Sequence, residues 1–261
     1  MAETILETIA AYARERVALA RRDYSFTTIR REAEGMDTPH SFLEALSRPG
    51  LSVIAELKKA SPSKGLICPN FEQLYLKQAE SYAAGGAAAI SCLTEPKWFL
   101  GRDEFLVNVH KAVELPILRK DFTVDEYQIY EAKLLGASAV LLICSLMNGS
   151  QLDEYLHLTH EIGLHALVEA HTAQEVEQAL KAGANIIGVN NRNLKDFTVN
   201  PTNSLRLRDM IPEGKIFVAE SGITKPSDCD ALKAAGVGAV LIGEALMRAA
   251  DPKAMIQEIS K

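Results

Sequence analysis

The sequence lacks long apolar runs and has few cysteines. None of its apolar runs reaches the roughly 20 residues that a bilayer-spanning helix needs, so no membrane span is expected. The four cysteines, Cys68, Cys92, Cys144 and Cys229, do not have metal-ligand spacing. We expect Cys92 and Cys144 to be small buried core residues. Such cysteine usage fits a reducing compartment and predicts a cytoplasmic protein.

The chain also lacks an excess of positive charge. Its net charge of -6 argues against a general nucleic-acid binder. The N-terminal residues have neither the apolar core nor the cleavage site of a signal peptide. A hydrophobic fraction of 48% and a charged fraction of 24% are typical of a globular protein. We therefore expect a small-molecule partner, with no nucleic-acid or membrane partner.

Eight short apolar runs are distributed along the chain, and most end in a polar or charged residue. Runs of this length, rich in Val, Ile and Leu, favour parallel strands that are covered on both faces. They are Val53–Ala55, Ala87–Leu93, Pro116–Leu118, Ala139–Ile143, Ala166–Val168, Ile186–Val189, Ile216–Ala219 and Val240–Ile242.

Helical patterns separate these runs, and several end at a glycine, the usual C-terminal stop. They are Phe71–Ala84, Arg102–Val113, Val124–Leu135, Ser150–Ile162, Ala173–Ala182, Thr202–Met210 and Pro226–Ala235, with an eighth beginning near Glu244. Thr224 is the expected N-cap of the helix at Pro226. Strands alternating with helices predict an α/β fold, the (β/α)8 TIM barrel.

The residues before the first strand form a separate helical pattern. Helical spacing relates Ile5, Ile9, Tyr12, Ala13 and Val17. This pattern predicts an amphipathic helix that covers one end of the barrel. A membrane-surface helix is less favoured, because glutamates break up its basic charge. We expect one domain over residues 1–261, of which residues 1–50 are an N-terminal helical extension.

Charged residues follow the first apolar run at once. Glu56 and Lys58 are two residues apart, so their side chains project from the same face of the strand. The same parity recurs in Lys120, Glu169, Asn190 and Glu220. If these faces point inward, the six side chains meet at the C-terminal mouth, where barrel enzymes have their active sites.

Crowded lysines and carboxylates favour acid–base chemistry, because their pKa values are pushed apart. The alternative is a neutral ion-pair cluster that seals the barrel end, although apolar residues would do so at less cost. Glu220-Ser221-Gly222 and Gly243-Glu244 follow the last two strands. Their small residues let backbone N–H groups approach an anion, so we expect a phosphorylated substrate.

These residues resemble the indole-3-glycerol-phosphate synthase family of tryptophan biosynthesis, and the resemblance covers nearly the whole chain. Its most specific parts are Ile54–Gly65 (IAELKKASPSKG), Leu118–Phe122 (LRKDF), Gly188–Leu194 (GVNNRNL), Ala219–Ile223 (AESGI) and Leu241–Met247 (LIGEALM). The resemblance implies a carboxy-lyase that closes 1-(2-carboxyphenylamino)-1-deoxyribulose 5-phosphate to indole-3-glycerol phosphate. It implies no cofactor and no metal, and it leaves open any association with other enzymes of the pathway.

The resemblance also implies roles for the charged residues. Lys120 is the expected general acid of ring closure, and Glu169 the expected base of the later dehydration. Lys58 is expected to hold the anthranilate carboxylate, and how the two lysines share the proton steps stays open. Orienting and hydrogen-bonding partners are expected in Glu56, Asn190 and Glu220.

Further substrate contacts are implied by the same resemblance. They are Ser61, Pro62, Phe99, Phe122, Leu141, Arg192, Leu194 and Ser221 for the organic part, and Gly222, Gly243 and Glu244 for the phosphate. One position departs from the family, which commonly has Gly-Ser where this chain has Gly101-Arg102. The departure bears on the placement of Phe99. The loop Lys59–Leu66 is expected to act as a lid over bound substrate, and the alternative is an ordinary exposed connector.

Two other functions compete with this interpretation. One is a different phosphate-binding barrel enzyme, such as phosphoribosylanthranilate isomerase or an aldolase with a nucleophilic lysine at position 58 or 120. The other is a catalytically silent barrel. Histidine adds little: His157 and His160 are three apart on a helix and are expected to be solvated. His171 is the histidine that lies near the expected chemistry.

Overall fold

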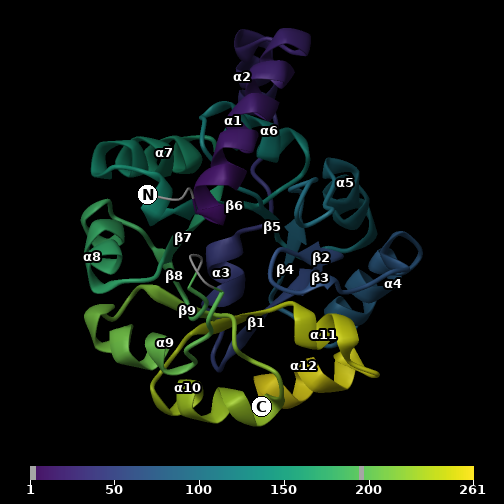
Figure 1. Cartoon of the computed structure of the whole chain (residues 1–261), viewed down its shortest axis with the longest axis vertical. Helices are drawn as coiled ribbons and strands as arrows, with labels where there is room; N and C mark the ends of the chain where they lie inside the picture. The colour runs from purple at the N-terminus through teal and green to yellow at the C-terminus, as the bar shows by residue number, and fades with distance from the viewer. Residues whose placement is uncertain (1–3, 194–196) are drawn as a thin grey trace.

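Eight parallel strands form a closed barrel in the computed structural model, which describes residues 4–193 and 197–261. The ring follows chain order and closes because β1 pairs with both β4 and β10 (Figure 1). The strands are β1 (Ser52–Leu57), β4 (Ala89–Leu93), β5 (Ile117–Lys120), β6 (Ala139–Ile143), β7 (His165–Ala170), β8 (Ile186–Asn190), β9 (Ile216–Glu220) and β10 (Ala239–Ile242). The predicted TIM barrel is confirmed.

Helices surround the barrel, as the glycine-terminated patterns predicted (Figure 1). They are α4 (Phe71–Ala84), α5 (Asp103–Ala112), α6 (Tyr127–Leu134), α7 (Gly149–Glu161), α8 (Ala173–Lys181), α9 (Thr202–Leu207), α10 (Asp230–Ala234), α11 (Glu244–Arg248) and α12 (Pro252–Ser260). A 3-10 turn, Arg208–Met210, follows α9.

The prediction of one helix over Pro226–Ala235, capped by Thr224, is wrong in detail. A 3-10 turn, Pro226–Cys229, precedes α10. The backbone N–H groups of Thr224 and Lys225 donate to Asp228 Oδ2 at 2.8 and 3.1 Å. The N-cap of this turn is Lys225, and the Thr224 hydroxyl donates to Asp228 Oδ2 at 2.8 Å, so Thr224 does not cap the helix.

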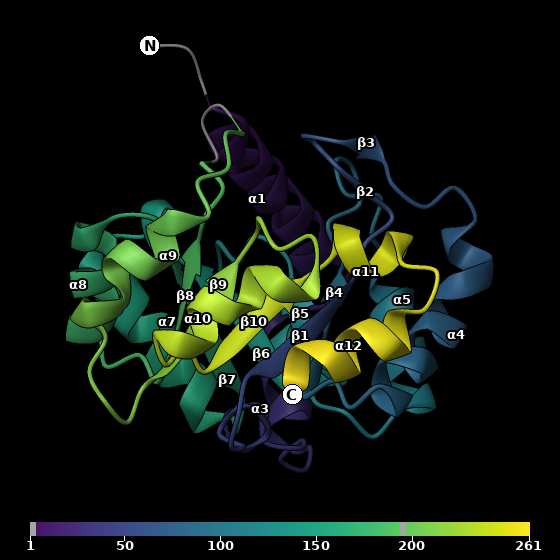
Figure 2. The same ribbon diagram turned by 90° about the horizontal axis from the view of Figure 1, so that it is seen from below.

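Alternate strand residues face the barrel interior and its outer wall. Ile54, Leu118 and Leu167 belong to the interior apolar cluster, whereas the neighbouring Val53 and Val168 pack under the surrounding helices. The period-2 assignment of faces is therefore confirmed for these strands. The short helix α3 (Phe42–Leu46) contributes to the interior cluster and lies at the end of the barrel opposite β2 (Ala60–Ser61) and β3 (Gly65–Leu66) (Figure 2).

The N-terminal extension contains α1 (Ile5–Asp23) and α2 (Phe26–Glu34). One face of α1 is buried, including Ile9, Ala13 and Val17, as its amphipathic pattern predicted. Figure 2 shows α1 on the same side of the barrel as β2 and β3. Within residues 4–193 and 197–261, no helix has the length and apolar character that crossing a membrane requires.

Candidate active site

A cavity of about 960 Å³ opens at the carboxyl ends of the barrel strands. Three residues of the extension, Ile5, Leu6 and Ile9, line it on one side. The structure also brings together at its wall the site residues predicted from sequence: Glu56, Lys58, Ser61, Pro62, Phe99, Lys120, Phe122, Leu141, Glu169, Asn190, Arg192, Glu220, Ser221, Gly222, Gly243 and Glu244. Leu194, the remaining prediction, lies outside the described residues.

Lys120, the last residue of β5, bridges two buried carboxylates from across the barrel. Its Nζ lies 3.0 Å from Glu169 Oε2 at the end of β7 and 3.1 Å from Glu220 Oε2 at the end of β9. Both glutamate side chains are at most 3% exposed. Because all three groups are inward-facing, their meeting follows directly from strand parity and barrel closure.

Burial and charge set the protonation of this triad. Burial alone would lower the pKa of Lys120, but the charges of Glu169 and Glu220 outweigh it and raise that pKa. Burial would raise the pKa of Glu169, yet Lys120 and His171 hold it below its usual range. Burial and the nearby Glu169 charge raise the pKa of Glu220 to about 7, against the opposing pull of Lys120. Lys120 is therefore charged at neutral pH and Glu169 is ionised.

A second ion pair occupies the end of β1. Lys58 Nζ contacts Glu56 Oε1, and Ser91 Oγ of β4 lies 3.4 Å from Glu56 Oε2. Glu56 is almost fully buried, whereas the side chain of Lys58 is 20% exposed at the cavity wall. Glu56 thus positions the ammonium of Lys58 from one side. The side of the ammonium that faces the cavity remains available to an anionic ligand.

Two glycines leave room for these carboxylates. A Cβ on Gly188 of β8 would collide with Glu220 Oε1. A Cβ on Gly243 would collide with Glu56 Oε1 and lie 3.0 Å from Lys58 Nζ. The role of Gly188 did not emerge from the sequence. Gly243 was predicted for phosphate contact alone, and its closeness to Glu56 gives a second reason for a glycine there.

The loop after β1 folds as a small hairpin over the cavity. Strands β2 and β3 pair antiparallel, with Ser61 opposite Gly65. The backbone N–H of Ile67 donates to Lys59 O at 2.8 Å and closes the base of the hairpin. Gly65 has a φ of +64°, a conformation that favours glycine. The loop is non-helical, as predicted, and carries Ser61 and Pro62 to the cavity wall.

Aromatic and aliphatic side chains form another part of the wall. The rings of Phe99 and Phe122 have centroids 6.1 Å apart, and Leu141 of β6 also lines the cavity. Arg192 donates through Nη1 to Phe197 O at 3.2 Å, and its backbone N–H donates to Asn190 Oδ1 at 2.9 Å. The apolar side chains of this wall suit contact with an aromatic ring.

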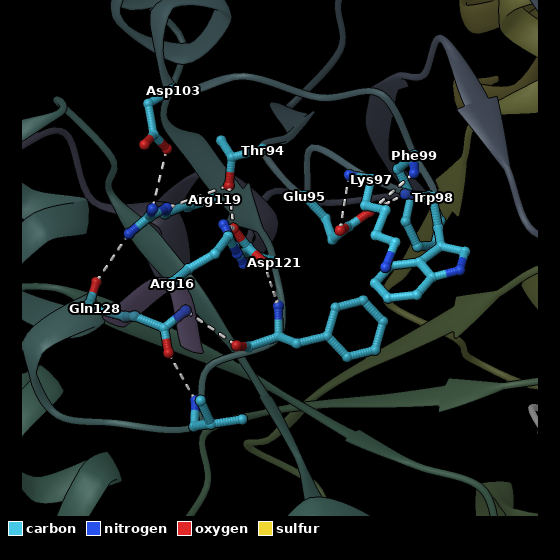
Figure 3. A network of polar contacts seen from close by, with 12 residues as sticks. Arg16, Thr94, Glu95, Lys97, Trp98, Phe99, Asp103, Arg119, Asp121 and Gln128 are labelled. Atoms are coloured by element: carbon cyan, nitrogen blue, oxygen red, sulfur yellow. Dashed lines mark hydrogen bonds and ion pairs between the residues drawn. The ribbon is translucent and has the colours of Figure 1, made fainter. Parts of the chain in front are cut away.

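Glu95, which was not predicted, fixes the loop that carries Phe99 (Figure 3). Its buried carboxylate accepts hydrogen bonds from the backbone N–H groups of Lys97, Trp98 and Phe99 at 2.7–2.9 Å. Gly101 follows, and a Cβ there would collide with Leu93 backbone atoms.

Arg102 leaves this arrangement intact. It precedes the first turn of α5, is exposed, and places its guanidinium 5.7 Å from the centroid of Phe105. Phe99 therefore reaches the cavity despite the departure from the family pattern at this position.

Small residues surround the part of the cavity predicted to bind phosphate. Ser221 and Gly222 follow β9 with φ values of +66° and +84°, so the chain turns sharply there. Gly243 is the N-cap of α11, and Glu244 accepts from Arg248 Nε at 3.1 Å through its side chain. The side chain of Glu244 is thus engaged with its own helix, and its backbone lies at the helix N-terminus.

Lys120 is flanked by two charged residues that anchor β5 on its other face (Figure 3). Asp121 accepts from Arg16 Nη2 of α1 and from Thr94 Oγ1, each at 2.7 Å. Arg119 donates to Asp103 Oδ1 at 3.0 Å and pairs with Glu131 Oε2 at 2.7 Å. The strand end that presents Lys120 is therefore held on both sides, and α1 supplies one of the anchors.

The histidines lie where the sequence predicted, His157 on an exposed helix face and His171 near the acid–base cluster. His157 is exposed and lies 3.3 Å from Glu161 on α7. No group of three or more His, Cys, Asp or Glu side chains among residues 4–193 and 197–261 is arranged to hold a metal ion. His171 lies next to the acid–base cluster, with Nε2 3.8 Å from Glu169 Oε1.

Comparisons with known proteins agree with this geometry. The family model of indole-3-glycerol phosphate synthase matches residues 6–259. The protein of that name from Ruminiclostridium cellulolyticum is 49% identical over 257 residues, which is 98% of each chain. The one from Lachnoclostridium phytofermentans is 53% identical over 218 residues, covering 84% of this chain and 80% of that protein.

Solved structures share the fold at lower sequence identity. A 3-hexulose-6-phosphate synthase has a TM-score of 0.64 and 17% identity, covering 80% of this chain and 98% of that one. This likeness concerns the barrel alone. The near full-length match to the family model and the identity to both relatives go further, and they show that the chain belongs to the indole-3-glycerol phosphate synthase family.

Proposed function

We propose that this protein closes 1-(2-carboxyphenylamino)-1-deoxyribulose 5-phosphate to indole-3-glycerol phosphate, with loss of CO₂ and water, by general acid–base catalysis. The observation that carries the proposal is the position of Lys120. Its ammonium lies between two buried carboxylates at the mouth of the barrel, with an aromatic wall and small-residue turns lining the same cavity.

The first step requires a proton donor for the ribulose carbonyl oxygen. Lys120 suits this step, because Glu169 and Glu220 keep its ammonium protonated inside a largely desolvated site. Protonating that oxygen makes the carbonyl carbon more electrophilic toward the anthranilate ring carbon. The bond between this ring carbon and the carboxylate then breaks and releases CO₂, and its electron pair neutralises the cationic ring and restores its aromaticity.

The dehydration step requires a base. Glu169 is ionised, and the neighbouring Lys120 stabilises its carboxylate. Glu169 can therefore accept a proton from the intermediate. Asn190 and Glu220 orient these groups from β8 and β9. The side chain of Glu220 contacts the same ammonium as Glu169 and holds it at the centre of the site.

The two ends of the substrate differ in chemistry, and so do the cavity walls. Phe99, Phe122 and Leu141 suit the aromatic ring, and Lys58 suits its carboxylate. The backbone N–H groups around Gly222 and Gly243 suit the phosphate. Ser61 and Arg192 are within the same cavity as hydrogen-bond donors for substrate oxygens.

The alternative of a Schiff-base aldolase is less well supported. A nucleophilic lysine must lose its proton, and a buried lysine does so when its surroundings lower its pKa. The carboxylates beside Lys120 raise its pKa instead, and Lys58 contacts Glu56. Lys120 is therefore suited to act as a cation and proton donor.

We infer further that residues 1–261 act as one domain in the cytoplasm, with residues 1–50 as its extension and without nucleic-acid or membrane partners. The lining of the cavity by Ile5, Leu6 and Ile9 supports the first part. The net charge of -6 and the four buried, unpaired cysteines support the second.

The test is to add the carboxyphenylamino-deoxyribulose phosphate to the purified protein and follow indole fluorescence. We expect one CO₂ released for each fluorescent product. A folded protein that yields no indole product, or a lysine adduct that borohydride traps, would overturn the proposal. The exposed Lys111→Ala variant on α5 controls for unspecific effects of losing a lysine.

A further inference from the structure

His171 lies directly behind Glu169, outside the cavity. It follows β7 and does not belong to the cavity wall. Its Nε2 is 3.8 Å from Glu169 Oε1, and its Nδ1 is 3.7 Å from Glu175 Oε2. Its side chain is 17% exposed, between the 3% of Glu169 and the 19% of Glu175. His171 thus lies between the buried Glu169 and the partly exposed Glu175.

The backbone around His171 fixes this placement. Thr172 and Glu175 form a capping box at the start of α8. The Glu175 carboxylate accepts from the backbone N–H groups of His171 and Thr172, and Asn203 of α9 donates to the His171 carbonyl at 3.2 Å. The backbone of His171 is therefore fixed by α8 and α9, and the ring itself lies between Glu169 and Glu175.

One atom of the ring remains available. His171 Nε2 is buried and has no hydrogen-bond partner among the residues that the structure describes. A buried polar atom of this kind is unfavourable unless a change of state satisfies it. Glu169 Oε1 is close enough that a shift of about 1 Å would form a hydrogen bond.

The charges that face His171 favour its protonated form. They are Glu169 on β7, Glu175 on α8 and Glu220 on β9, while α9 presents the uncharged Asn203. Burial lowers the pKa of His171, but these carboxylates outweigh it and raise the pKa above its ordinary 6.5. Beyond Glu169, Lys120 already holds its own proton and offers no acceptor.

We propose that His171 transfers the proton that Glu169 accepts during dehydration out to solvent, by way of Glu175. The proposal rests on the role of Glu169 in the proposed function. The proton moves from Glu169 Oε1 to Nε2 of the neutral imidazole, which restores the carboxylate. The imidazolium then releases its Nδ1 proton to Glu175 or water, and proton exchange with water returns the imidazole to the Nδ1–H tautomer before the next turnover. His171 acts through Glu169 as a positioning and proton-transfer residue and does not contact the substrate.

The experiment compares His171→Asn with the wild type in single-turnover rapid-quench assays from pH 5.5 to 9. In the wild type the dehydration rate should rise with pH as the imidazole becomes neutral, through an inflection above pH 6.5. The variant should lose this rise and dehydrate at least ~10-fold more slowly, with ring closure and substrate KM little changed. Added imidazole should restore part of the dehydration rate.

The matched control is His157→Asn, which removes an exposed histidine that also pairs with a glutamate in its own helix. Its pH profile should equal that of the wild type. Glu175→Gln keeps an acceptor for the backbone donors but removes a charge, so the wild-type inflection should move to lower pH. Thermal melts of each variant separate a loss of fold from a loss of proton transfer.

The outcomes are distinguishable. If Glu169→Gln blocks dehydration but His171→Asn keeps the wild-type profile, the proposal for His171 is overturned and the proposed function stands. If Glu169→Gln itself dehydrates normally, the base assignment fails first. A loss of the pH-dependent rise, recovered by imidazole, supports proton transfer and would not follow from a purely structural role.

Discussion

At the scale of single residues, the site depends on pairs of charges that are buried together. Lys120 neutralises Glu169 and Glu220, and each of the three would be unfavourable alone at this depth. A change at one of them therefore alters both chemistry and stability. The two effects can be separated, because the chemistry requires the proton of Lys120, whereas stability requires only that the buried charges be balanced.

Lys120→Met should lower turnover by at least ~10², because the acid of ring closure is lost. It should also destabilise the fold by about 3–5 kcal/mol, since two buried carboxylates lose their cation. Steady-state assays and denaturant unfolding measure the two quantities. In the double variant Lys120→Met/Glu220→Gln, stability should recover in part while turnover stays low. Near-normal turnover in the single variant would exclude Lys120 as the acid.

Gly243→Ala tests whether this glycine serves the ion pair of β1 as well as the phosphate. The added Cβ would push against Glu56 Oε1 and Lys58 Nζ. We expect kcat to fall at least ~10-fold, because Lys58 is displaced, and affinity for a dephosphorylated analogue to fall too. Calorimetric binding of the phosphorylated and dephosphorylated ligands makes the comparison. A loss confined to the phosphorylated ligand would mean that Gly243 serves the phosphate alone.

At the scale of elements, α1 is part of the active site and not only a cover. It contributes Ile5, Leu6 and Ile9 to the cavity wall and Arg16 to the anchor of β5. Arg16 and Asp121 are 105 positions apart in sequence, and Figure 3 shows their contact beside Thr94 and Arg119. The position of the helix and the position of Lys120 are thereby coupled.

Arg16→Met should destabilise the protein by about 1–3 kcal/mol, because the buried Asp121 loses a bidentate partner. Turnover should fall as well, since Asp121 neighbours Lys120. In the double variant Arg16→Met/Asp121→Asn, both losses should be smaller than the sum of the single losses. Denaturant unfolding and kcat measurements of the four proteins form the cycle. Strictly additive losses would show that the contact does not couple the two elements.

The alternation of side chains along the strands was enough to predict which polar residues enter the site. The six polar residues at strand ends were predicted from parity, and their convergence needs only a closed barrel. Asp121 was not found, because its partner Arg16 lies on a distant helix. Glu95 was not found, because it accepts from backbone N–H groups, which every residue except proline carries and which leave no mark in the sequence. Gly188 was not found either, because a glycine is required there only by the side chain of Glu220 on the neighbouring strand.

At the scale of the whole molecule, the acid–base cluster makes stability depend on pH. The pKa of Glu220 is raised to about 7 from an ordinary 4.5, so the folded state retains a proton that the unfolded chain has lost between these values. Stability from this residue is therefore lost as pH rises from 4.5 to 7, and is constant above. The pKa of Glu169 is lowered instead, so the stability that this residue contributes is lost as pH falls.

Glu220→Gln removes the ionisation and isolates this effect. The unfolding free energy of the variant, minus that of the wild type, should increase from pH 4.5 to 7 by up to about 3 kcal/mol. Denaturant unfolding at half-unit pH intervals measures it. Glu177→Gln, an exposed change on α8, should show a flat difference. A flat difference for Glu220→Gln as well would contradict the raised pKa.

The pairing of β10 with β1 also has a consequence for synthesis of the chain. Residues 52–55 of β1 pair with residues 239–242 of β10. One edge of β1 therefore stays uncovered until β10 has been synthesised. During translation at ~5–20 residues per second, that edge stays exposed for about 9 to 37 seconds, open to pairing with a neighbouring nascent chain. Lys58 and Gly243, which meet across this seam, come together only after nearly the whole chain has left the ribosome.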